Sequence, residues 1–313
     1  GDVGEHADDG ADIAGDLAQL GDRLVHCAGI GHGAVGDVEA LAGATVGALN
    51  HVLTGHVEGG EVSGTVDELI RHAVTKLSHL HFVANDQARQ RLVQLGEHEA
   101  SIHVIGSPDV DVMNSDAFPG IDEVRRRYGF DFDRYAVLAR HPVTSEQLDL
   151  RRQVRVLVDE VIASGRNFVV IYPNNDSGTD HILDEYQRLT ERRNFRVYPS
   201  MRFEYFLSLL KHADFIIGNS SAGVREAPHF GVPAINLGSR QNNRVRCTSV
   251  IDEQINPAAV ASAIERAALL PRLPSALFGD GDSASRFCEL LGRVSLWSTG
   301  TQKYFVDRAL HRP

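Results

Sequence analysis

From about Tyr135 onward, short apolar runs alternate with stretches whose apolar residues recur at helical spacing. The runs predict strands and the intervening stretches predict helices. The predicted strands are 135–139, 167–172, 195–198, 214–218 and 233–237, and the predicted helices are 146–164, 180–192, 202–212, 222–230 and 257–269. This alternation predicts an α/β domain whose parallel sheet is covered on both faces and binds ligands at the carboxyl ends of its strands.

The first part of the chain has the same alternation in a less complete form. Helices are predicted at 38–51, 67–79 and 86–95, and strands at 52–55, 81–84 and 102–105. The segment 107–127 carries Pro108, Pro119 and Gly120, which favours a linker. Residues 1–36 contain no clear apolar strand, which is unusual for the start of an α/β domain.

Composition narrows the class of protein. The 313 residues are enough for two domains, and the net charge of -11 argues against a nucleic-acid partner. No apolar run is long enough to span a membrane, so no membrane partner is expected. The cysteines, Cys27, Cys247 and Cys288, are far apart and form no CxxC pair, so neither a zinc site nor a disulfide framework is expected. A reducing cytoplasm is the expected compartment.

Residues 56–68 place four carboxylates and a histidine around glycine turns, directly before a predicted helix. The carboxylates are Glu58, Glu61, Asp67 and Glu68, and the histidine is His56. Such a density of carboxylates on a glycine-rich backbone suggests proton transfer. The alternative is a polar loop in which Ser63 or Thr65 caps the helix and the acidic residues favour its positive end.

A second polar segment, residues 219–226, follows the predicted strand that ends at Gly218. Ser220 and Ser221 would lie at a helix start, where unpaired backbone amides and the helix dipole favour a phosphate. Glu226, one turn later, could accept hydrogen bonds from ribose hydroxyls. The alternative is an ordinary serine N-cap.

Two further residues follow strands of the same predicted sheet. Arg240 comes after 233–237 and could clamp a diphosphate, although surface arginines are common. His141 comes after 135–139 and could serve a leaving phosphate or act as acid–base, although a lone histidine before proline is more often structural.

Two patterns are weaker. Residues 31–36 fit G-x-G-x-x-G, but 23–28 is a poor strand and no suitable acid follows at the right distance, so a nicotinamide cofactor is not expected. His72, His79 and His81 spread over a helix and the following strand, so we expect helix surface rather than a metal site.

Taken together, these segments resemble the hydrolysing UDP-N-acetylglucosamine 2-epimerases of the sialic-acid pathway. The matching segments are HVEGGEVSGTVDELIRHAVTKLSHLHFV (56–83), VIGSPDVDVM (104–113), RHPVT (140–144), YPNNDSG (172–178), IIGNSSAGVREAPHFGVPAINLGSRQNNR (216–244) and FGDGDSASR (278–286). They come in the family order over about residues 36 to 290. One departure is Gly36-Asp37-Val38, where the family usually has Gly-Asp-Arg.

The resemblance implies an α/β fold of two Rossmann-like domains of glycosyltransferase-B type, with a cleft between them. The expected divisions are an incomplete N-terminal domain at 1–118, a UDP-binding domain at 119–287 and a helical segment at 288–313 that packs back on the first domain. A homodimer or homotetramer is also implied, with a UDP-sugar as the partner and no metal or redox cofactor.

The resemblance also implies a mechanism, in which UDP is eliminated through a 2-acetamidoglucal that water converts to N-acetylmannosamine for sialic or related nonulosonic acids. It places catalytic residues at Asp37, Glu58, Asp67 and His141. It places UDP-sugar contacts at Ser220, Ser221, Gly223, Glu226 and Arg240. Three alternatives stay open: the same reaction on UDP-2,4-diacetamido-2,4,6-trideoxyglucose, a catalytically impaired UDP-sugar binder, and a glycosyltransferase of the same fold.

Overall fold

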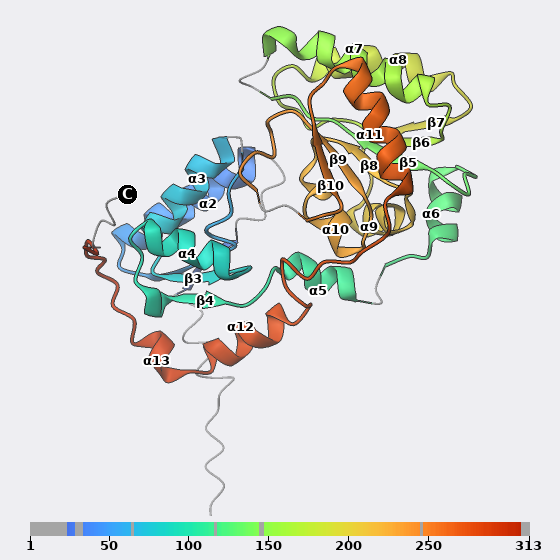
Figure 1. The fold of residues 1–313 in the computed structure, drawn as a ribbon. Coiled ribbons are helices and arrows are strands. Elements are labelled where there is room, and N and C mark those ends of the chain that lie inside the picture. The colour runs from blue at the N-terminus through green and yellow to red at the C-terminus, as the bar shows by residue number, and fades with distance from the viewer. Residues whose placement is uncertain are drawn as a thin grey trace, which may run out of the picture.

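The computed structural model describes residues 24–28, 34–63, 66–115, 118–143, 147–244 and 247–307. Within these ranges the chain forms two parallel sheets, which lie side by side in Figure 1 and confirm the predicted α/β class. The first sheet pairs its strands in chain order, as β1 (Leu24–Ala28), β2 (Leu53–Val57), β3 (Leu80–Val83) and β4 (Ile102–Val104). Its helices are α2 (Ala34–Leu49), α3 (Val66–Leu77) and α4 (Asp86–Gln94).

The second sheet has the order β10-β9-β8-β5-β6-β7, and all its pairs are parallel. Its strands are β5 (Ala136–Ala139), β6 (Phe168–Ile171), β7 (Phe195–Tyr198), β8 (Ile216–Gly218), β9 (Ala234–Leu237) and β10 (Val250–Glu253). Counted from β5, this is the doubly wound order of a Rossmann sheet. The direction of winding reverses between β5 and β8, so a crevice for ligands is expected at their carboxyl ends.

Helices cover both faces of the second sheet because its strands are apolar on both sides. Leu138 and Val170 pack with α7 (Gln147–Ala163), α8 (Thr179–Thr190) and α11 (Pro257–Leu269), whereas Val137 and Val169 pack with α6 (Ile121–Tyr128) and α9 (Phe203–His212). Successive strand residues point to opposite faces, so each strand contributes to both cores.

The chain returns to the first sheet after α11. Ser107 donates its backbone N–H to Phe278 O at 2.7 Å, so the two connections between the domains lie side by side. Helices α12 (Ser283–Leu291) and α13 (Val294–Trp297) follow beneath the first sheet (Figure 1). Leu290 and Leu296 pack there against Leu80 and Phe82 of β3.

Several predicted elements need correction. Residues 24–28 form β1, which pairs with β2, although His26 interrupts its apolar run. The expected linker 107–127 contains α5 (Pro108–Asn114) and most of α6, because Pro108 starts a helix at its first position instead of breaking one. The expected helix 222–230 is a 3-10 turn, η3 (Ser221–Gly223), followed by the short helix α10 (Glu226–His229).

The last residues of the glycine pattern, 34–36, open α2, the helix that follows β1 in the chain. Residues 29–33 are outside the described part of the chain. The carboxylate that follows the next strand, Glu58, is engaged in an ion pair described below and is not free for a ribose. None of the described helices is long and apolar enough to cross a membrane.

Gly218 ends β8 at the point where the second sheet reverses. Its φ of 142° suits glycine, and a Cβ there would lie 1.9 Å from Ala139 O of the adjacent strand. We expect Gly218→Ala to lower the free energy of unfolding by about 2 kcal/mol or more. Urea denaturation measures this, with Gly300→Ala as control because a Cβ at Gly300 meets nothing within 4 Å. Equal stability of both variants would contradict the close approach of Gly218 to Ala139.

Candidate functional site

The site begins at the switch point of the second sheet. His141 follows β5 and Asn219 follows β8. Asn219 Oδ1 accepts from the His141 backbone N–H at 2.7 Å, and Asn219 Nδ2 donates to His141 O at 2.9 Å. The two hydrogen bonds lock the two strand ends together at the position where doubly wound sheets bind their ligands.

His141 is a neutral hydrogen-bond donor. Its Nδ1 accepts from the Asn174 backbone N–H at 3.1 Å, so the ring proton of the neutral form lies on Nε2. Burial, followed by the charge of Arg240, lowers the pKa of His141 to about 3. The imidazole can therefore donate to an anionic oxygen at neutral pH, but it is not an imidazolium acid.

The loop after β8 carries the predicted phosphate contacts. Ser220 caps η3, with its Oγ accepting from the Ala222 N–H at 3.3 Å, and Ser221 is half-buried beside it. Gly223 lies buried in the same turn. Glu226 begins α10 with 5% exposure, and its Oε2 is buried without a hydrogen-bond partner among the described residues.

Arg240 interacts with predicted site residues of both domains. It lies just past β9 and donates Nη1 to Asn219 O at 3.2 Å. Burial lowers its pKa, whereas the charges of Asp67 and Asp176 raise it. Asp67 belongs to the first turn of α3, so a carboxylate of the first domain lies within electrostatic reach of an arginine at the switch point.

An ion pair between the domains joins Glu58 to Arg225. Glu58 follows β2 with a φ of 63°, and its backbone N–H donates to Phe82 O at 2.8 Å. Arg225 Nη2 lies 2.6 Å from Glu58 Oε1, 2.9 Å from Ser107 Oγ and 3.2 Å from Asp109 Oδ2. The Ser107 hydroxyl also donates to Glu58 Oε1 at 2.5 Å.

Both members of this pair stay charged. Burial acts to raise the pKa of Glu58, but the charge and hydrogen bond of Arg225 and the Ser107 hydroxyl outweigh it, so the pKa lies below 4.5. Burial acts to lower the pKa of Arg225, but the charges of Glu58, Glu226 and Asp109 hold it above its usual value. Glu58 is thus held as a carboxylate by the opposite domain.

Two more buried groups, Arg244 and Glu61, interact electrostatically at the domain boundary. Arg244 donates Nε to Val62 O at 2.9 Å, and burial lowers its pKa to about 10. Its Nη1 and the Oε1 of Glu61 are both buried without a hydrogen-bond partner in the described part of the chain. Buried polar atoms are rarely left unpaired, so these atoms are candidates to contact a ligand.

The structure thus brings most of the predicted site residues to the domain boundary. His141, Ser220, Ser221 and Arg240 surround the switch point, and Asp67 approaches Arg240 from the other domain. Asp37 lies in α2, but its side chain is outside the described residues. Sequence reasoning missed Arg225, Ser107, Asp109 and Arg244. Arg225 and Arg244 bind partners that are more than 100 residues away in the chain, and no local pattern reveals such contacts.

The expected helix-surface histidines are another correction. His79 and His81 are buried in a hydrogen-bond network, whereas His72 pairs with Glu68 at 3.5 Å on α3. Among the described residues no group of histidine, cysteine and carboxylate side chains could hold a metal ion.

These features define a two-domain α/β protein of the glycosyltransferase-B type, with carboxylates of one domain opposite the arginines and serines of the other. The model of the UDP-N-acetylglucosamine 2-epimerase family matches residues 34–292. The chain belongs to this family.

Known relatives agree with this assignment. A UDP-N-acetylglucosamine 2-epimerase of Neisseria meningitidis is 47% identical over 274 residues, which cover 86% of this chain and 72% of the relative. A UDP-N,N'-diacetylbacillosamine 2-epimerase (hydrolyzing) of Legionella pneumophila is 34% identical over 84% of this chain and 71% of its own. The fold matches the Methanocaldococcus jannaschii UDP-GlcNAc 2-epimerase, solved in complex with UDP-GlcNAc and UDP, with a TM-score of 0.71 at 22% identity over 90% of this chain and 78% of that one.

The ion pair between the domains makes a prediction for stability. Arg225→Met leaves the buried Glu58 and the half-buried Asp109 without their counter-charge, and should cost about 3–5 kcal/mol of unfolding free energy. The double variant Glu58→Gln/Arg225→Met removes the nearest uncompensated charge and should recover part of this loss. Urea denaturation of both variants measures the effect. A loss under ~1 kcal/mol, as for an exposed pair, would contradict the role of Arg225.

Proposed function

We propose that the chain is a hydrolysing UDP-N-acetylglucosamine 2-epimerase, which converts UDP-N-acetylglucosamine and water to N-acetylmannosamine and UDP. The observation that carries this proposal is the ion pair of Glu58 with Arg225, together with Asp67 within electrostatic reach of Arg240, across the domain boundary. Removal of a sugar C–H proton needs a positioned base, and departure of a diphosphate needs positive charge and hydrogen-bond donors. Both kinds of group are present here.

The hydrolysing subtype has its own support. The Legionella relative, whose name states that it hydrolyses, is 34% identical over most of the chain. The segment 58–65, E-G-G-E-V-S-G-T, resembles the hydrolysing enzymes more than the non-hydrolysing ones. The same relative makes UDP-2,4-diacetamido-2,4,6-trideoxyglucose the second candidate substrate.

The reaction divides into two steps. In the first, a carboxylate takes the C2 proton while the C1–O bond breaks, and the electron pair leaves with UDP to give 2-acetamidoglucal. In the second, water adds its oxygen to C1 and a proton reaches C2 from the opposite face. The product is N-acetylmannosamine, which we propose is used for sialic or related nonulosonic acids.

We assign the roles as follows. Asp37, Glu58 and Asp67 are the acid–base carboxylates. Neutral His141 donates Nε2–H to the leaving diphosphate, and Arg240 supplies positive charge beside it. Contacts to UDP come from Ser220, Ser221, Gly223 and Glu226, whose Oε2 has no partner among the described residues. No metal or redox cofactor has a role in these steps.

We also propose domains at 1–118 and 119–287, with 288–313 packed back on the first domain, and a homodimer or homotetramer in the cytoplasm. The packing of Leu290 and Leu296 on the first sheet supports the return of the C-terminal segment. Cys247 and Cys288 are free thiols, which suits a reducing compartment.

The reaction is tested by incubating the protein with UDP-N-acetylglucosamine in D₂O and, separately, in H₂¹⁸O. We expect UDP and free N-acetylmannosamine that carries deuterium at C2 and ¹⁸O at C1, detected by mass spectrometry and NMR. UDP-2,4-diacetamido-2,4,6-trideoxyglucose is assayed in parallel. Formation of UDP-N-acetylmannosamine without the free sugar would contradict the hydrolysing subtype, and UDP binding without turnover of either substrate would contradict the enzyme.

The role of Asp67 is tested against its neighbour on the same helix. Asp67→Asn removes the proposed acid–base group and should lower kcat by about 100-fold or more. The control Glu68→Gln keeps an oxygen for the Ser63 N–H, which Glu68 Oε2 accepts at 2.7 Å, and should retain near-normal kcat. Steady-state kinetics of UDP release measure both. Equal kcat values for the two variants would remove Asp67 from the catalytic set.

A further inference from the structure

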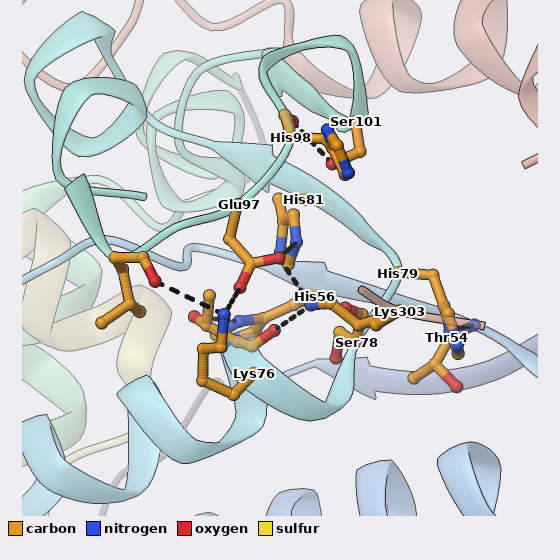
Figure 2. Close-up of polar contacts among 12 residues, drawn as sticks. Thr54, His56, Lys76, Ser78, His79, His81, Glu97, His98, Ser101 and Lys303 are labelled. Atoms are coloured by element: carbon orange, nitrogen blue, oxygen red, sulfur yellow. Dashed lines mark hydrogen bonds and ion pairs between the residues drawn. The ribbon is translucent and has the colours of Figure 1, made fainter. Parts of the chain in front are cut away.

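A buried polar network connects the end of the described chain to the first sheet (Figure 2). Residues 299–307, which we name the C-terminal strap, follow α13 and run along the side of the first domain (Figure 1). His79 Nδ1 accepts from the Thr54 N–H at 3.0 Å, so its Nε2–H donates to Thr301 O of the strap, also at 3.0 Å. This neutral imidazole joins β2 to the strap.

Lys303 is the main anchor of the strap. Its ammonium donates to Thr75 O at 3.2 Å and to Ser78 O at 2.6 Å, at the C-terminal end of α3. Its third partner is Glu97 Oε2 at 2.5 Å. An ammonium has three donors, so every one is used, and a cation at the end of a helix also interacts favourably with the helix dipole.

Glu97 is the centre of the network. It is 2% exposed, and it accepts from Lys76 at Oε1 (2.8 Å) and from His81 at Oε2 (3.0 Å) as well as from Lys303. Burial acts to raise the pKa of Glu97, but these hydrogen bonds lower it to about 2. The carboxylate is therefore anionic at neutral pH, and loss of Lys303 would weaken the compensation of a buried charge.

The same network reaches the turn that bears Glu58. Thr75 of α3 bonds through Oγ1 to His56 Nδ1 at 3.0 Å, and burial lowers the pKa of His56 to about 3. A Cβ at Gly59 would lie 2.9 Å from His56 Nδ1, so the backbone after Glu58 rests on this neutral ring. The helix that Lys303 holds at one end carries Asp67 in its first turn at the other.

We propose that Lys303 is a positioning residue for the reaction. The strap, anchored by this ammonium to Glu97 and to the end of α3, holds α3 against β2 and β3. In this way it fixes the first turn of α3 with Asp67 and the turn with Glu58, neither of which Lys303 contacts. The kinetic part of this inference rests on the function proposed above.

The kinetic test compares Lys303→Ala with Gln302→Ala, an exposed neighbour on the strap. Misplacement of catalytic groups lowers turnover more than binding, so Lys303→Ala should lower kcat by about 10- to 100-fold with little change in KM. UDP affinity, a property of the second domain, should be unchanged, and Gln302→Ala should behave as wild type. Lys303→Arg, which keeps the charge, should recover much of the lost kcat.

Chemical rescue adds a second readout. Lys303, Glu97 and His79 line a cavity of about 550 Å³, through which a small cation can reach the vacated position. Ethylammonium should therefore restore part of the kcat of Lys303→Ala and leave wild type unaffected. Wild-type kcat in Lys303→Ala, or a loss that neither ethylammonium nor Lys303→Arg restores, would overturn the proposal.

Hydrogen exchange separates this inference from the proposed function. In Lys303→Ala, peptides covering 56–70 should exchange faster than in wild type and in Gln302→Ala. Faster exchange confined to 299–307 would overturn the positioning role. If wild type turned over neither UDP-sugar, the proposed function would fail, whereas the exchange pattern would still decide whether the strap orders the carboxylate-bearing segments.

Discussion

The guanidinium of Arg225 extends from the loop after β8 to three oxygens of the first domain, those of Glu58, Ser107 and Asp109. Arg225 and Glu58 are both largely withdrawn from water, with 14% and 10% of their side chains exposed. A buried charge without a partner is costly, so each domain supplies the counter-charge that the other needs. Glu58 and Arg225 therefore keep their counter-charges only while the two domains stay in contact.

The positions of the other site residues are set by the carboxyl ends of the strands in the two sheets. Parallel strands present their carboxyl ends at one edge, which brings His141, Asn219 and Arg240 together at the reversal of the second sheet. In the first domain, Glu58 follows β2, and Asp67 starts the next helix. The strap then acts from the opposite end of that helix, through Lys303 and Glu97.

The hydrophobic pattern of the sequence predicted the elements whose formation depends on nearby residues. Five strands of the second sheet, all except β10, and helix 257–269 were predictable because apolar residues recur at the strand and helix periods. Strand β1 was not, because its evidence is pairing with β2 and not an apolar run. The resemblance brought Glu58 and Asp67 into the set, but no spacing could show that Arg225 pairs with a residue 167 positions away. Likewise, His79 and His81 were expected at a helix surface, but both are buried in the structure. His79 bonds Thr301 of the strap, which is 222 positions away in the chain.

The central claim is that Arg225 assembles the site by holding Glu58 as a buried carboxylate across the domain boundary. It is tested most directly by the ¹³C NMR titration of the Glu58 side-chain carboxyl in wild type and in Arg225→Met. The account predicts a pKa below 4.5 in wild type and a clear rise in the variant, where burial acts without the opposing charge. The same pKa in both proteins would contradict it.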